Sequence, residues 1–384
     1  MIKIPFYDFK KENIDIGFKY PVDVKLQLPD GDYLRAKQPY GTWQSLQKIN
    51  RETGAVSNIY THSSNIQFVP LEVLNDGNVL VLGFDYPHHN YRILRSTDET
   101  LTSFEEVLFL GHMKPYSKHG VAQGEDGNIL MGEYIGSYAW NEPDAPDKCN
   151  VWISRDNGWT WQVLYSFKRR THPDSDSDEL MGNGIQHIHI VEYDPFTKSY
   201  WIGTGDKDRE SSLWRWNEQE GFVLIGRGYA DGFEIDDGQY WRVLALEFFE
   251  DCVLWGIDSF IDGGTWIMRY DRNSKKLEVM NDETLGTAGY YSGTLNLPGG
   301  NQVSFFSGET GRIFYSYDQK KAELLTEVSM TTNVATRPLY TEDVIDKRML
   351  FTGYDGNLEI DGRSLGTGYI DFKPREFKIN FLNS

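Results

Sequence analysis

The sequence has only two cysteines, Cys149 and Cys252, and no long apolar run. Two cysteines are too few for a disulfide framework, and a membrane-spanning helix needs ~20 consecutive apolar residues. Residues 1–17 lack the apolar stretch of ~7–15 residues that marks a signal peptide. We therefore expect a cytoplasmic protein, or a virion-associated protein made in the cytosol, although a leader could have been removed from this start.

Basic residues are also scarce. The chain has 38 Lys and Arg against 57 Asp and Glu, which gives a formal net charge of −19. Such a charge repels nucleic acid and anionic membranes at long range, so we expect neither as a partner. It favours solubility. It does not exclude an acidic sugar, because salt confines the global field to ~8–10 Å and a local basic pocket can still bind an anion.

Aromatic residues and glycine are abundant, with 23 Tyr, 21 Phe, 11 Trp and 37 Gly. This composition favours sheets with frequent turns, and no stretch predicts a helix. Residues 185–216 show the pattern best. Their first strand, 187–193, alternates with period 2, which indicates a half-buried strand. A turn at Asp194 and Pro195 follows, and then strands at 200–203 and 212–216, separated by a polar loop at 205–210.

Units of this kind recur about every 40–50 residues, which is the signature of a β-propeller. We expect a single all-β domain over residues 1–384, with seven blades of four antiparallel strands. Six blades and a terminal ribbon are the alternative. A strand at Ile2 to Tyr7 or at Phe377 to Phe381 could complete the last blade. The expected blades span residues 21–62, 66–110, 117–168, 185–227, 240–281, 288–329 and 332–384.

Residues 154–161, SRDNGWTW, fit the pattern S-x-D-x-G-x-T-W of the Asp-box. This motif predicts a hairpin between the third and fourth strands of a blade. In it Asp156 caps turn amides, Gly158 supplies a positive φ, and Trp161 packs the turn onto the blade. A less complete copy lies at residues 96–104.

On this motif the chain resembles the sialidase-like, Asp-box (BNR-repeat) β-propeller superfamily. The resemblance implies the fold rather than an activity, because the superfamily includes sialidases, other glycosidases, polysaccharide lyases and non-catalytic binding proteins. The F/Y-R-I-P motif of sialidases is missing, since the nearest string, YRIL at 91–94, lies at a third strand. The string HIH-x-x-x-x-DP at 187–195, with a following GD, looks like uncharacterised bacterial and phage Asp-box proteins.

Histidines gather where a propeller would bind a ligand. Loops from second to third strands and the starts of first strands lie on one face around the axis, and ligand sites usually occupy that funnel. Five of the eight histidines belong to this set, namely His88, His89, His119, His187 and His189.

His187 and His189 are the first candidates for chemistry. Alternation places both on one side of a strand, about 6–7 Å apart. They could act as general acid and base, or bind a metal with Glu133 or Asp206. Alternatively, one is structural and the other lies on the surface.

Glu133 and Asp206 occupy equivalent positions in adjacent expected blades. Two carboxyl groups on opposite sides of a sugar could serve as the acid and the nucleophile or base of a glycosidase. Alternatively, each caps its loop or pairs with Lys207 or Arg209.

Further funnel residues are candidates for substrate binding. Arg242 and Arg337 could clamp the carboxylate of a uronate or sialate, or pair with nearby acids. Tyr290 could stack on a sugar or act as a lyase acid, or pack in the core. The remaining candidates for substrate binding are His119, Tyr134, Asp208, His88 and Trp140.

These residues lead to two hypotheses. The first is a carbohydrate-active enzyme that cleaves a polysaccharide or glycoconjugate. It would hydrolyse its substrate with Glu133 and Asp206, or eliminate at a uronic acid with a His or Tyr as base. The second is a non-catalytic glycan- or receptor-binding propeller, for instance on a phage tail. No cofactor is certain. A divalent metal is the one considered, either Ca²⁺ at the acidic run 174–179 or Zn²⁺ or Mn²⁺ at the histidines.

Overall fold

A computed structural model describes most of the chain, and every structural statement below refers to the described residues. Of residues 2–20, 117–118, 289–291, 295–296, 307–308, 326–327 and 336–379 it describes the backbone alone. The described residues are 2–7, 14–20, 26–36, 45–62, 66–85, 88–135, 146–169, 184–208, 210–228, 238–261, 264–283, 289–296, 302–308, 312–327, 336–342, 348–353, 359–360, 363–364, 367–372 and 374–379.

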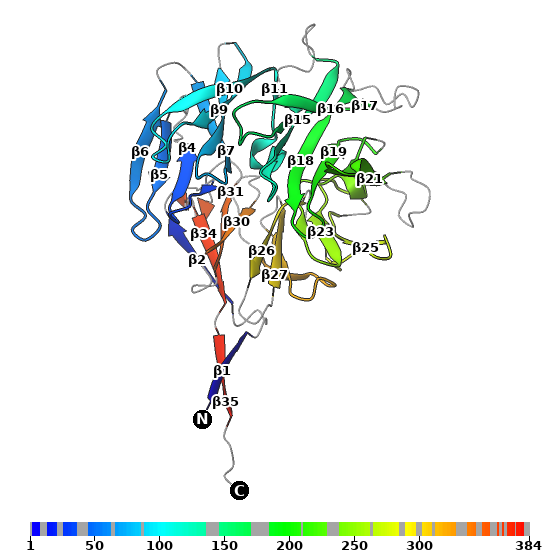
Figure 1. The fold of residues 1–384 in the computed structure, drawn as a ribbon. Coiled ribbons are helices and arrows are strands. Elements are labelled where there is room, and N and C mark those ends of the chain that lie inside the picture. The colour runs from blue at the N-terminus through cyan, green and yellow to red at the C-terminus, as the bar shows by residue number, and fades with distance from the viewer. Residues whose placement is uncertain are drawn as a thin grey trace.

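The chain folds as an all-β propeller. Its described strands form seven sheets of four or five strands, which Figure 1 shows arranged in a ring in chain order. The first four sheets consist of β3 (Leu26–Gln27), β4 (Tyr33–Ala36), β5 (Ser45–Ile49) and β6 (Val56–Thr61); β7 (Ile66–Val73), β8 (Val79–Asp85), β9 (Asn90–Ser96) and β10 (Phe104–Gly111); β12 (Val121–Gln123), β13 (Ile129–Gly132), β15 (Lys148–Ser154), β16 (Gln162–Arg169) and β17 (Gly184–Ile185); and β18 (His187–Asp194), β19 (Ser199–Gly205), β20 (Ser212–Asn217) and β21 (Gly221–Arg227).

The last three sheets continue the ring. They consist of β22 (Glu247–Phe248), β23 (Cys252–Gly256), β24 (Ile267–Asp271) and β25 (Leu277–Val279); β26 (Gly289–Asn296), β27 (Gln302–Gly308), β28 (Arg312–Ser316) and β29 (Glu323–Glu327); and β30 (Thr336–Glu342), β31 (Arg348–Gly353), β34 (Thr367–Phe372) and β2 (Ile14–Tyr20). The blade boundaries expected from the sequence stay a prediction.

Three pairs of short strands lie outside these sheets. They are β1 (Ile2–Tyr7) with β35 (Pro374–Ile379), β11 (Met113–Lys114) with β14 (Tyr134–Ile135), and β32 (Glu359–Ile360) with β33 (Arg363–Ser364). Helical structure in the described ranges is limited to two 3₁₀ turns, η2 (Ser117–Gly120) and η4 (Gly238–Trp241). No helix in the described part of the chain is long and apolar enough to cross a bilayer.

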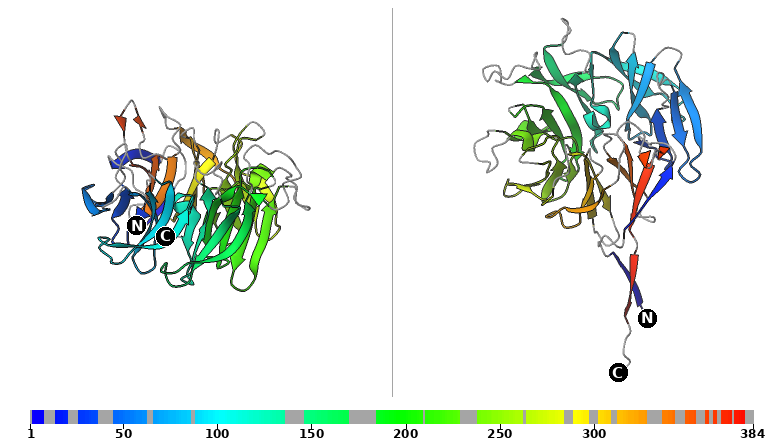
Figure 2. Two further views of the ribbon diagram at one scale, coloured as in Figure 1. Left: turned by 90° about the horizontal axis from the view of Figure 1, so that it is seen from above. Right: turned by 180° about the vertical axis from the view of Figure 1, so that it is seen from behind.

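The terminal strands correct one expectation. The strand that pairs with β34 in the last sheet is β2, so a segment after the first strand completes that sheet. Both candidates named from the sequence belong elsewhere, because β1 pairs with β35 from Ile2↔Ile379 to Tyr7↔Pro374. This two-stranded ribbon projects from the ring and carries both ends of the chain (Figures 1 and 2).

Short turns of one kind connect first and second strands. In the second sheet Gly77 has φ +81°, and the Asp76 carboxylate accepts a hydrogen bond from the Asn78 amide at 3.1 Å. The third sheet repeats this arrangement with Gly127 at φ +80° and Asp126. Glycine tolerates the left-handed region and aspartate caps a nearby amide, which is why this sequence pattern marks the turns.

The first strand of the fourth sheet, β18, lies near the middle of the ring and packs between two neighbouring sheets (Figure 1). Ile188 and Val191 join a core cluster with the third sheet, whereas Ile190 joins a cluster with Trp241 and Trp255. Residues 187–191 are therefore all buried. The half-buried strand predicted from the alternation was wrong, because in this fold both faces of an inner strand are covered.

The Asp-box residues form the expected hairpin between β15 and β16. The Asp156 carboxylate accepts hydrogen bonds from the Thr160 amide at 2.8 Å, the Thr160 hydroxyl at 2.6 Å and the Ser154 hydroxyl at 2.9 Å. Gly158 has φ +88°, and Trp161 Nε1 donates to its carbonyl at 3.1 Å. Hydrogen bonds to one carboxylate thus hold the turn closed.

We expect the substitution Asp156→Ala to lower the free energy of unfolding by about 1–2 kcal/mol, because three hydrogen bonds to the turn are lost. The urea midpoint should fall with an unchanged slope. The control is Arg155→Ala, which removes only an exposed ion pair with Glu218 and should change stability by less than about 0.5 kcal/mol. Equal effects of the two substitutions would contradict this account of the hairpin.

Candidate functional site

The site is formed where β18 begins and β19 ends. His187 pairs with Gly205 across the two strands, Ile188 pairs with Thr204, and Ile190 pairs with Gly203. His189 is therefore the extra residue of a β-bulge. Bulges re-aim side chains, and here the bulge accompanies the convergence of the two imidazoles. Asp206 follows directly after β19.

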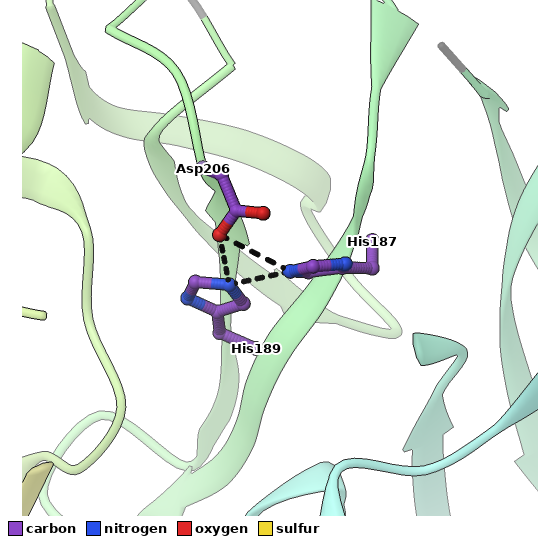
Figure 3. A group of neighbouring side chains, drawn as sticks. All are labelled: His187, His189 and Asp206. Carbon is purple, nitrogen blue, oxygen red and sulfur yellow. Dashed lines mark hydrogen bonds and ion pairs between the residues drawn. The ribbon is translucent and has the colours of Figure 1, made fainter. Parts of the chain in front are cut away.

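One side-chain atom from each of His187, His189 and Asp206 lies close to the other two (Figure 3). His187 Nε2 lies 2.7 Å from His189 Nε2. Asp206 Oδ1 lies 3.0 Å from His189 Nε2 and 3.3 Å from His187 Nε2. The sequence predicted separate side chains about 6–7 Å apart on a regular strand. The structure instead brings the two ring nitrogens into contact.

The three atoms fit the coordination sphere of a divalent transition metal. A metal about 2.1 Å from each ligand atom separates neighbouring ligand atoms by about 3.0 Å at right angles and about 3.4 Å at tetrahedral angles. Two of the three separations, 3.0 and 3.3 Å, lie in that range, and the third, 2.7 Å, is slightly shorter. Two imidazoles and a carboxylate suit Zn²⁺ or Mn²⁺ better than Ca²⁺, which prefers oxygen ligands.

The charges around the three atoms keep them ready to bind a cation. Burial lowers the pKa of His187 to about 4, so its ring is neutral at neutral pH. Burial alone would raise the pKa of Asp206, but hydrogen bonds with His187 and His189 outweigh it and hold that pKa well below its usual range. The site therefore presents a neutral imidazole at His187 and an ionised carboxylate at Asp206, which are the forms that bind metals.

Arg242, which follows η4, joins this group from the neighbouring sheet. Its Nη2 lies 2.9 Å from Asp206 Oδ1 and 3.0 Å from Asp258 Oδ2. One guanidinium thus faces two carboxylates, which leaves this group with a formal excess of one negative charge. Arg242 thus orients Asp206 and ties the fourth and fifth sheets together at the site.

The loop after β19 is held by buried polar contacts that the sequence did not indicate. Glu210, 2% exposed, accepts hydrogen bonds from the Asp206 amide at 3.2 Å and the Gln186 amide at 3.1 Å. Gln239 donates to the Asp206 carbonyl at 3.0 Å and to Asp208 Oδ1 at 2.7 Å. Asp208 therefore fixes the loop.

Tyr134 covers one side of the histidine pair. Its ring stacks on His187 with centroids 3.8 Å apart and planes at 24°. The ring of Tyr116 lies 4.8 Å from Tyr134 and 6.3 Å from His189. Lys114, opposite Tyr134 in the β11–β14 pair, places its ammonium over the Tyr134 ring at 5.8 Å. The sequence pointed to Tyr134 but gave no signal for Tyr116 or Lys114.

Glu133 belongs to a different network. Its carboxylate accepts hydrogen bonds from the Asn150 amide at 2.7 Å, the Asn150 side chain at 3.2 Å and Trp152 Nε1 at 2.7 Å. It is only 3% exposed. Burial raises the pKa of Glu133, and the three N–H donors oppose that shift. The carboxylate of Glu133 is thus held by N–H donors of strand β15, and its pairing with Asp206 in a glycosidase stays a prediction.

Two predicted histidines lie away from the cluster. His88 is exposed and its Nδ1 lies 2.9 Å from Asp85 Oδ2. His119 Nδ1 lies 3.5 Å from Glu192 Oε1, whose other oxygen accepts a hydrogen bond from the Leu246 amide at 3.0 Å.

Several other candidates cannot be placed from this structure. Trp140, Arg209 and the acidic run 174–179 lie outside the described residues. Tyr290 and Arg337 lie on the described backbone of β26 and β30, and their roles stay predictions.

No protein-family model matches the chain, and no curated protein matches it in sequence. Among solved structures it is similar to oligogalacturonate lyase from Vibrio parahaemolyticus, with TM-score 0.55, 13% identity and 96% of each chain covered. It is similar to an oligogalacturonate lyase in complex with manganese, with TM-score 0.56, 10% identity, and 97% of this chain and 96% of that chain covered. A chain in the Mitotic Checkpoint Complex gives TM-score 0.55, 8% identity, and coverage of 96% and 94%. At these identities the likeness shows the β-propeller fold alone.

We expect Glu133→Gln to lower the free energy of unfolding by about 1–3 kcal/mol, although the two side chains have nearly the same shape. Whichever way the amide turns, its NH₂ group faces an N–H donor of Asn150 or Trp152. Urea unfolding measures the effect, with Glu218→Gln at an exposed ion pair as the control. Unchanged stability of the Glu133 variant would show that this carboxylate has no structural role.

Proposed function

We propose that the chain is a metal-dependent, carbohydrate-active enzyme that cleaves uronic-acid-containing glycans by β-elimination. The observation that carries this proposal is the convergence of His187 Nε2, His189 Nε2 and Asp206 Oδ1 at one point. The group is a candidate for Mn²⁺ or Zn²⁺ by its donors and their spacing.

Elimination agrees with the site better than hydrolysis. A glycosidase needs two carboxyl groups on either side of the scissile bond. Glu133 is buried and bound to Asn150 and Trp152, so it is not available to protonate a leaving group. Elimination needs a different set of groups, namely a positive centre for the uronate carboxylate and a base near C5.

Two of the similar structures add support. Both are oligogalacturonate lyases, and one is in complex with manganese. Their likeness to this chain lies in the fold, so the substrate comes to this chain only as part of the proposal.

Each residue of the site has its own role in this proposal. His187 and His189 offer imidazole nitrogens, of which His187 is neutral, and Asp206 offers the negative charge. Arg242 orients Asp206, and Tyr134 fixes the plane of the His187 ring by stacking. The chemistry that a divalent ion supplies when bound is neutralisation of charge on the uronate carboxylate, which makes the C5 proton more acidic.

We also propose that the hairpin at residues 154–161 is a true Asp-box and that the chain belongs among the sialidase-like, Asp-box propellers. The contacts of Asp156, Gly158 and Trp161 support this assignment. The propeller would have seven blades, a polysaccharide as partner, and a location in the cytoplasm or in a virion.

We expect Mn²⁺ to raise the thermal midpoint of the wild-type chain, because a ligand bound only by the folded state adds about 2.7 kcal/mol at 100 times its Kd. His189→Gln should abolish this shift. The matched control is His88→Gln, since His88 is exposed and lies away from the cluster. Equal shifts in the two variants would contradict the proposed metal site.

The reaction is tested by incubating the Mn²⁺-loaded full chain with polygalacturonate and with neutral glycans. We expect ultraviolet absorbance from a new C4–C5 double bond with polygalacturonate only. New reducing ends without this absorbance would indicate hydrolysis. Retention on a glycan array without cleavage would favour the non-catalytic glycan-binding propeller instead.

A further inference from the structure

Elimination needs a base, and the two imidazoles of the cluster do not provide a free one. Their Nε2 atoms face each other and Asp206, where a metal would occupy both lone pairs. Another group near the cluster must therefore take the C5 proton. Lys114 is the described residue whose position and surroundings suit this task.

Lys114 is fixed in place by its backbone. It lies in the short strand β11, directly opposite Tyr134 of β14. Met113, the residue before it, is 1% exposed and belongs to the core cluster beside β18. The Lys114 side chain is partly buried, and the ring of Tyr134 contacts both its amine and the His187 ring.

The surroundings of the amine are aromatic. Nζ lies 5.7 Å from the centre of the Tyr91 ring, from β9, and 5.8 Å from the centre of the Tyr134 ring, from β14. Within the described ranges, no carboxylate lies within ion-pairing distance of it and no second cation contacts it. A cationic side chain that is desolvated by burial is normally paired with an acidic side chain. The surroundings of Lys114 are therefore unusual for a lysine with a purely structural role.

Two effects act on the proton of this amine. The faces of the two rings attract the ammonium, whereas burial disfavours the charged form. Burial lowers the pKa of Lys114. Lysines desolvated in this way serve as bases and nucleophiles in enzymes.

We propose that Lys114 is the general base that removes the C5 proton of the uronate, a role that rests on the lyase function proposed above. The amine nitrogen takes the proton and becomes an ammonium. The electron pair of the C5–H bond forms the C4–C5 double bond while the C4–O bond breaks. The leaving glycosidic oxygen takes a proton from water. No electrons are gained or lost overall.

The test measures kcat/KM of the Mn²⁺-loaded full chain on polygalacturonate as a function of pH. The variants are Lys114→Arg, which keeps a charge but cannot act as a base, and Lys114→His. Lys148→Arg is the control at an exposed lysine. Lys114→Arg should lower kcat/KM by about 100-fold or more with an unchanged thermal midpoint. Lys114→His should retain part of the activity and move the rising limb of the pH profile towards the imidazole pKa of about 6.5.

A second readout does not depend on turnover. Competitive acetylation at a series of pH values reports the proton affinity of each lysine, and Lys114 should become reactive at lower pH than Lys148. Full activity of the Lys114→Arg variant would show that Lys114 is not the general base. Its remaining role would then be to bind the substrate carboxylate. A wild-type chain without activity on polygalacturonate would overturn the lyase proposal and the base together. If the wild type is active but the rising limb of the pH profile does not move in Lys114→His, the proposal that Lys114 is the base is contradicted, while the lyase proposal stands.

Discussion

Packing of each sheet between its two neighbours is the constraint on which the rest of the structure depends. Along β18, Ile188 and Val191 pack towards the third sheet and Ile190 packs towards the fifth. A glycine on the facing strand makes this spacing tight. A Cβ on Gly132, in the third sheet, would lie 2.4 Å from Ile188 Cγ2, in the fourth. Apolar packing thus fills the space between sheets and confines polar side chains to the ends of the strands.

The site is a consequence of this arrangement. At the start of β18 the bulge at His189 ends the regular ladder, and the loop after β19 brings Asp206 to the two imidazoles. Arg242 comes from the segment after η4 and Tyr134 from the short strand β14, so three parts of the chain meet at Asp206 and His187. Burial keeps His187 neutral, while hydrogen bonds with the two histidines keep Asp206 ionised. The same packing that stabilises the ring therefore also sets the charges of the site.

The repeat in the sequence was enough to predict the propeller, because strands of period 2 between glycine-rich turns leave few other architectures. Position within the repeat also identified His187, His189, Asp206 and Arg242, which the structure brings together. Glu133 has an equivalent position in the repeat, but its carboxylate accepts hydrogen bonds from N–H donors of the third sheet. The bulge at His189 has no sequence signal, and Lys114 lies in no motif. Two terminal segments with similar apolar alternation could not be told apart, so the closing strand β2 was missed.

The central claim is that three atoms of this chain hold a divalent metal ion. The most direct measurement is anomalous X-ray diffraction at the manganese edge from crystals of the full chain grown with Mn²⁺. The account predicts an anomalous peak about 2.1 Å from His187 Nε2, His189 Nε2 and Asp206 Oδ1. A peak elsewhere on the chain, or none at this position under saturating Mn²⁺, would contradict it.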